Sequence, residues 1–122
     1  MTTSTLSSVR ENAGSGWRPR AGEGSDDQWP HRALRFPLGR IVATPGAIGE
    51  FERAGESPLT YLVRHATGDW GHLDEHDRKA NERAVSAGER ILSAYLLRTG
   101  ERIWVITEAD RSATTFLLPS EY

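Results

Sequence analysis

Residues 91–118 limit the fold of this chain more than any other stretch. They contain three runs of apolar and β-branched side chains, at 91–97, 103–107 and 113–118. The first polar separator contains Gly100, which can adopt the positive φ that a tight hairpin turn requires. Three such runs with short connections predict an antiparallel meander. Pro119 ends the last run, because proline cannot donate to a strand ladder.

Three short helices are predicted between a first strand, residues 39–43, and this meander. Their start signals are N-cap residues, two of them followed by proline: Thr44-Pro45, Ser57-Pro58 and Asp74. Their stop signals are glycines, at Gly55, Gly68 and Gly88. The order β–α–α–α–β–β–β predicts an α+β domain, in which three short helices cover one face of a small antiparallel sheet that ends in a three-stranded meander.

The first thirty residues differ in composition from the rest of the chain. They are rich in polar residues and glycine and have almost no aliphatic side chains, so they cannot bury enough surface to offset the entropy of ordering. We therefore expect residues 1–30 to form a disordered tail and residues 31–122 to form a single domain. Trp17 and Trp29 are open to two interpretations, docking on the domain or a partner, and solvation within the tail.

Composition argues against several classes of protein. The chain has no cysteine, and therefore no disulfide framework and no thiolate ligand or nucleophile. No run approaches the roughly 18 apolar residues of a membrane span, and no signal-peptide core is present. The formal net charge is -2, which gives no overall field for nucleic acid. We expect a cytoplasmic protein with no membrane partner and no cofactor; its oligomeric state is left open.

The segment from His72 to His76 matches the HxxEH pattern of inverted zinc proteases. That chemistry requires two imidazoles on one helical face and a glutamate that acts on a bound water. An N-cap at Asp74 would leave His72 outside the helix. The sequence therefore predicts a polar helix start, with its acids near the positive end of the helix dipole, and no metal site.

Two polar segments are candidates for one functional surface. The loop 68–71 brackets an acid and an indole with glycines, and the segment 108–115 gathers acids, an arginine and hydroxyls after the second strand of the meander. The binding candidates are Asp69, Trp70, Asp110 and Arg111. The planar fork of Arg111 would grip a phosphate or carboxylate at two points. The alternative is an ordinary turn, in which Asp110 bonds its own backbone and Arg111 pairs with Glu108 or Asp110.

His65 is a candidate general acid or base, because an imidazole titrates near neutral pH. It lies near the apolar face of the second predicted helix, so the alternative is a half-buried side chain with a structural role. The candidate catalytic residues are His65, Glu108, Arg111 and Thr114.

The blocks ATPGA, GDWG, SAY and ITEADRS, the last followed by TT and LLP, all lie between residues 39 and 122. Together they resemble a family of small bacterial proteins from mobile elements, commonly labelled plasmid-related. Some members carry the label of a type I restriction enzyme subunit. This chain is too short for the doubly wound sheet and glycine-rich cofactor loop that a methyltransferase needs. The resemblance implies a plasmid or phage origin and no particular activity.

Two functions are compatible with the sequence. The first is a non-enzymatic accessory protein that binds another protein or nucleic acid of the mobile element. The alternative is a small metal-independent ribonuclease, similar in outline to the barnase–RelE class of toxins, with candidate residues His65, Arg90, Tyr95, Glu108, Arg111 and Thr114. Such toxins are usually basic, because they grip a phosphate backbone. Residues 39–122 carry 10 basic and 13 acidic side chains, which favours the non-enzymatic function.

Overall fold

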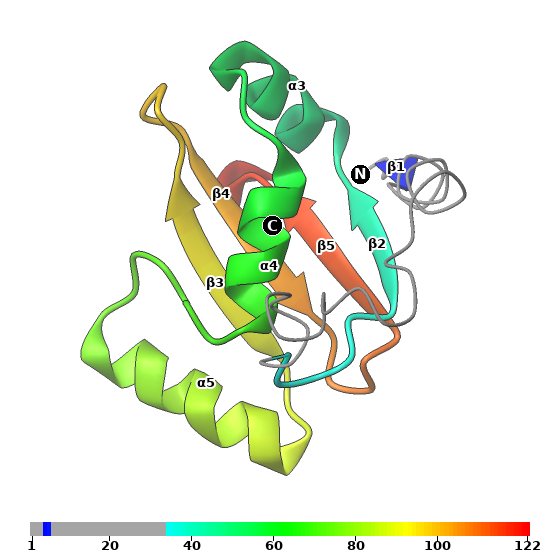
Figure 1. Cartoon of the computed structure of the whole chain (residues 1–122), viewed down its shortest axis with the longest axis vertical. Coiled ribbons are helices and arrows are strands. Elements are labelled where there is room, and N and C mark those ends of the chain that lie inside the picture. The colour runs from blue at the N-terminus through cyan, green and yellow to red at the C-terminus, as the bar shows by residue number, and fades with distance from the viewer. Residues whose placement is uncertain (1–3, 6–33) are drawn as a thin grey trace, which may run out of the picture.

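The computed structural model describes Ser4, Thr5 and residues 34–122 (Figure 1). The elements in chain order are β1 (Ser4–Thr5), β2 (Arg40–Ala43), α3 (Pro45–Ala54), α4 (Pro58–Ala66), α5 (Glu75–Ala87), β3 (Ile91–Leu96), β4 (Arg102–Thr107), β5 (Ala113–Leu117) and the 3-10 helix η2 (Pro119–Glu121). The strands form one sheet in the order β1-β2-β5-β4-β3. The predicted α+β class, the three helices and the C-terminal meander are confirmed.

The sheet is mixed, which differs from the antiparallel sheet expected. β3, β4 and β5 pair antiparallel as a meander. β2, however, pairs parallel with β5, from Arg40 opposite Ala113 to Ala43 opposite Phe116. The alternation of apolar residues in a strand of four residues predicts which side chains are buried, but carries no information on the direction of its partner.

The helices begin and end largely where the local signals predict. The side chains of Thr44, Ser57 and Asp74 accept hydrogen bonds from the first turns of α3, α4 and α5. Gly55 and Gly88 end α3 and α5 in the left-handed conformation. α4 ends at Ala66, so Thr67 rather than Gly68 is its C-cap. Among the described helices, none has the length and apolar character needed to cross a membrane.

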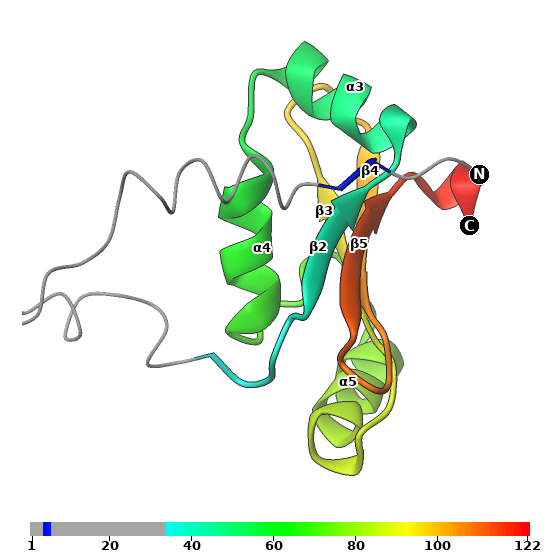
Figure 2. The same cartoon turned by 90° about the vertical axis from the view of Figure 1, so that its right-hand side faces the viewer.

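The main core lies between α3, α4 and one face of the sheet, as Figure 2 shows. Phe51 and Tyr61 from the helices pack there against Tyr95 and Phe116 from the strands. α5 lies at one end of the sheet beside β3 rather than over its middle (Figure 1). Its buried side is narrow, consisting of Asn81 and Ala84, which explains why it joins a smaller second cluster.

Ser4 and Thr5 pair antiparallel with Ala43 and Val42. They belong to the stretch expected to form a disordered tail, and as β1 they cover the outer edge of β2. Trp17 and Trp29 lie outside the described residues, as does most of the predicted tail, so these expectations stay predictions.

Replacing Gly100 by valine tests the turn between β3 and β4. Gly100 has a φ of 95°, and a Cβ there would meet no atom within 4 Å, so the substitution adds backbone strain without a steric clash. We expect a loss of about 1–2 kcal/mol in the free energy of unfolding, measured by denaturant melts. Gly49→Ala, in α3 with equally open space, is the control and should be neutral or stabilising. An unchanged melt for Gly100→Val would contradict a left-handed turn at this position.

Candidate functional site

A chain of hydrogen bonds starts at His65 and crosses the helix-facing side of the sheet. His65 lies on α4 and is fully buried. Its Nδ1 is 2.6 Å from the Ser93 hydroxyl oxygen, and its Nε2 is 2.9 Å from that of Thr107. The Thr107 and Thr114 hydroxyl oxygens are 2.7 Å apart, and Thr114 donates to the Leu38 carbonyl at 2.7 Å. We call His65, Ser93, Thr107 and Thr114 the His65 network.

The direction of donation in the His65 network follows from the single proton on each hydroxyl. Thr114 gives its proton to a carbonyl, so Thr107 must donate to Thr114. The Thr107 oxygen is then an acceptor, and the Nε2–H of His65 donates to it. Burial keeps the ring neutral, so Nδ1 of His65 carries no proton and accepts from Ser93. The imidazole then has one defined tautomer, with both nitrogens bonded.

Burial sets the charge state of His65. Desolvation lowers the pKa of this imidazole from 6.5 to about 3, and the nearby positive charge of Arg111 acts in the same direction. An isolated charge costs a large free energy in a buried, low-dielectric site, so the neutral form is favoured. Chemically, the His65 network joins α4, β3, β4 and β5 and has no charged member.

The ring of Phe36 brings three predicted site residues together. His65 meets it edge-on with a centroid distance of 5.2 Å, and Trp70 stacks at 6.2 Å with an interplanar angle of 21°. The Arg111 guanidinium carbon lies 5.6 Å from the ring centroid. Sequence analysis did not select Phe36 as a site residue; its signal was the alternation of apolar residues in 34–38, which predicts burial but not these neighbours.

Trp70 is buried and has a partner for its single polar atom. Its Nε1 donates to Glu82 Oε2 at 3.0 Å, and the same carboxylate accepts from both terminal nitrogens of Arg35. The hydrogen bonds from Arg35 and Trp70 lower the pKa of Glu82. These contacts join α5 to the loop 68–71 and to Arg35. Trp70 therefore has a structural role in packing.

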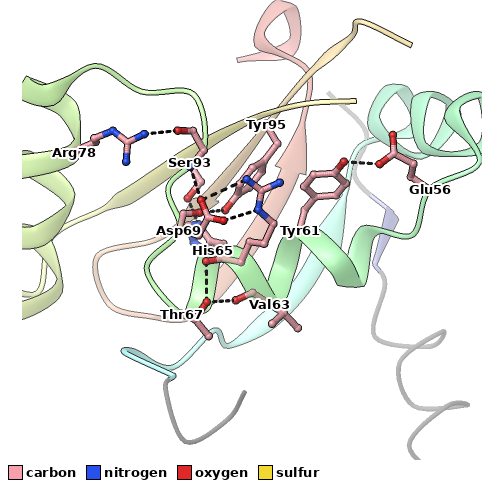
Figure 3. Close-up of polar contacts among 11 residues, drawn as sticks. Glu56, Tyr61, Val63, His65, Thr67, Asp69, Arg78, Ser93 and Tyr95 are labelled. Carbon is pink, nitrogen blue, oxygen red and sulfur yellow. Dashed lines mark hydrogen bonds and ion pairs between the residues drawn. The ribbon is translucent and has the colours of Figure 1, made fainter. Parts of the chain in front are cut away.

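Asp69 is held from both sides of the loop. Its carboxylate accepts from Arg64 Nε at 2.7 Å and from the Gly71 amide at 3.2 Å. The hydrogen bond from Arg64 lowers the pKa of Asp69. The main-chain carbonyl of Asp69 accepts from the Tyr95 hydroxyl at 2.6 Å. Figure 3 shows Asp69, His65 and Tyr95 close together where α4 meets β3.

Gly71 lets the loop approach β3 rather than a ligand. It forms a parallel bridge with Ala94, and the flanking residues bond that strand: the Ala94 amide donates to the Trp70 carbonyl, and the His72 amide to the Ala94 carbonyl. A Cβ on Gly71 would lie 2.0 Å from the Ala94 oxygen. The glycine is therefore required for a contact within the fold.

Arg111 donates to four main-chain carbonyls. Nη1 lies 2.7 Å from Glu89 O, 3.0 Å from Glu108 O and 3.3 Å from Ala109 O, and Nη2 lies 2.9 Å from Ala84 O. The guanidinium thus joins the C-terminal end of α5, where a cation is favourable, to the turn between β4 and β5. The carboxylate partners that the sequence suggested for Arg111 are replaced by these carbonyls. Its φ of 61° is the only positive value among the described non-glycine residues.

The two acids of the same turn are exposed and differ in their contacts. Asp110 accepts from the Ser112 amide at 2.9 Å, the local bond expected of a turn. Hydrogen bonds from Ser112 lower the pKa of Asp110. The Glu108 carboxylate bonds no described residue, and it stands outside the His65 network. The structure therefore brings the buried His65 and Thr114 together and places the half-buried Arg111 near His65, with Glu108 and Asp110 on the surface.

The HxxEH segment follows the expectation of a helix start. Asp74 accepts from the Asp77 amide at 2.8 Å as the N-cap of α5. Potential ligand atoms of Asp74, His76 and Asp77 lie within 4.8 Å of one another, all on exposed side chains. This proximity follows from the cap itself. Within the described residues, His72 does not join that group, so the two histidines of the motif do not act as a pair.

Comparison of the chain with protein-family models, with curated proteins and with solved structures finds no match. The resemblance to plasmid-related proteins therefore stays a prediction. Any function has to be inferred from the contacts of the residues themselves.

Substitution of Arg111 by lysine tests whether this side chain supports the fold. Lysine keeps the charge but loses the planar fork, so it cannot bond carbonyls on α5 and in the turn together. We expect a loss of about 1–3 kcal/mol in the free energy of unfolding. The control is Arg83→Lys, exposed on α5, which should change stability by less than ~0.5 kcal/mol. Equal melts for both variants would mean that Arg111 is available for the binding role predicted from the sequence.

Proposed function

We propose that this chain is a non-enzymatic interaction protein. The observation that carries the proposal is the state of His65, the one candidate acid–base group that titrates near neutrality in water. It is fully buried, and both ring nitrogens are bonded to hydroxyls of the sheet.

A general acid or base must reach the proton that it transfers, and its pKa should lie near the working pH. His65 meets neither condition, since burial lowers its pKa to about 3. Protonation would also force Nδ1 to donate, which would reverse the bond that it accepts from Ser93. These facts support a structural role for the imidazole and weaken the ribonuclease alternative.

The remaining ribonuclease candidates are divided between the interior and the surface. Tyr95 is buried and donates to the Asp69 carbonyl, and desolvation raises its pKa. The Thr114 hydroxyl belongs to the His65 network. Arg90 and Glu108 are exposed, and Arg90 bonds the Tyr122 hydroxyl at 2.7 Å. This division favours an interaction protein over an enzyme.

The sequence resemblance supports a partner that belongs to a plasmid or phage. On this proposal the protein acts in the bacterial cytoplasm by binding another macromolecule of the element. The loop that contains Asp69 and the turn that contains Asp110 are both tied down by internal bonds, so they would present a preformed surface.

Incubation of the purified full chain with a single-stranded RNA of mixed sequence tests the proposal. We expect no cleavage above a protein-free control, because His65, the candidate acid–base group, is buried and cannot reach a substrate. Glu108→Gln, at an exposed position without a bonded partner, is the matched variant and should behave identically. Cleavage by the wild type that falls at least about 100-fold in a folded Glu108→Gln protein would establish the ribonuclease instead.

A further inference from the structure

The face of the sheet opposite α4 is not covered by a described α-helix, as Figure 2 shows. Side chains alternate along each strand, and Ile103, Val105 and Thr107 of β4 are buried toward the helices. The intervening residues of β4 therefore point to the other side, which we call the open face. Strand register then adds neighbours from β2, β3 and β5. Its larger apolar side chains are Val42, Leu92, Leu96, Trp104, Ile106 and Leu117.

Much of this apolar surface is accessible. Leu96 is 44% exposed, and Val42, Leu92 and Trp104 are half-buried. Tyr122, which is 64% exposed, lies edge-to-face with Trp104 at a centroid distance of 5.4 Å. Ile106 and Leu117 are buried, at 3% and 4% exposed. The accessible apolar side chains around them include two aromatic rings, and such a group on one face of a sheet indicates a contact surface.

Arginines flank the patch without neutralising partners. Arg40 is level with Ala113 at one end of the open face, and Arg102 is opposite Leu96 at the other. Both are exposed, and neither forms an ion pair within the described part of the chain. The strand positions that point to the open face include no aspartate or glutamate. The face is therefore locally positive at both ends, although residues 39–122 carry more acidic than basic side chains.

The edges of the sheet are closed to an added strand over most of their length. On β3 the Asn81 side chain bonds both the amide and the carbonyl of Leu92, and the loop around Gly71 bonds those of Ala94. On the other side the edge strand is β1, which has only two residues. A partner must therefore meet the open face through side chains, because strand addition needs unpaired main-chain groups.

We infer that the open face binds a protein partner whose surface presents carboxylates on both sides of an apolar centre. This inference rests on the proposed function and specifies its partner. Tryptophan, tyrosine and arginine are the residue types that dominate binding energy at protein interfaces. Carboxylates placed opposite Arg40 and Arg102 would complete two charge-assisted pairs at the rim.

Two other occupants fit the open face less well. In a second copy packed face to face, the apolar side chains would match. The arginines, however, would find no carboxylate to pair with on the strands of either open face. A single-stranded nucleic acid could stack its bases on the two aromatic rings. The aliphatic side chains beside the rings, however, would make no specific contact with it. A protein partner accounts for the aromatic, aliphatic and cationic groups together.

Selection of peptides from a random display library against the immobilised full chain tests the inference. The wild type should enrich peptides in which acidic residues flank aromatic or aliphatic ones. The double variant Arg40→Glu/Arg102→Glu should enrich basic peptides instead, and should bind the wild-type-selected peptides at least about 10-fold more weakly. The control Lys79→Glu/Arg83→Glu changes net charge equally on exposed positions of α5 and should retain the wild-type preference.

The inference fails if no peptide is enriched, or if the selected peptides bind both double variants equally. It also fails if oligo-dT binds more tightly than the peptides, or if sedimentation shows a dimer that Arg40→Glu/Arg102→Glu dissociates. These results are separable from the test of function. A chain that cleaves RNA and still selects acidic peptides contradicts the proposed function alone, whereas a chain that does neither contradicts this inference alone.

Discussion

The neutral imidazole of His65 holds four elements of this fold together. Its two nitrogens bond hydroxyls on β3 and β4, and the second of these continues to β5. A buried polar chain stabilises a fold only when every donor and acceptor is satisfied, because an unpaired group costs its full desolvation energy. Here each hydroxyl proton and both ring nitrogens have a partner, so the relative positions of α4 and three strands are specified by directional bonds as well as by apolar packing.

The contacts around Phe36 and Arg111 depend on the same arrangement. His65 and Trp70 both pack against Phe36, which also lies under the Arg111 guanidinium. Arg111 in turn binds carbonyls of α5 and of the turn between β4 and β5. The polar groups that would be expected to perform chemistry are thus used to join helices to the sheet, and the accessible surface of unusual composition lies on the opposite face.

The parts of the fold that depend on local signals could be predicted from the sequence, whereas the parts that depend on distant pairing could not. Thr44, Asp74 and Gly88 determine helix ends through bonds within a few residues. The parallel pairing of β2 with β5 joins residues about seventy positions apart, and no local pattern encodes it. Sequence analysis brought Trp70 and Arg111 to one region but treated them as surface groups. Both pack against Phe36, whose position only the tertiary structure defines, and their polar atoms bond Glu82 and main-chain carbonyls.

The central claim, that His65 is a neutral structural group, is tested most directly by an NMR titration of its imidazole in the full chain. Because the folded pKa lies below the ordinary value of 6.5, protonation favours the unfolded state. The stability that comes from keeping His65 neutral is fully present above pH 6.5. Below that pH, the free energy of unfolding should fall by ~1.4 kcal/mol per pH unit. We predict a neutral ring with its proton on Nε2 throughout the folded state, down to acid unfolding. A titration midpoint between pH 6 and 7 in the folded protein would contradict the account.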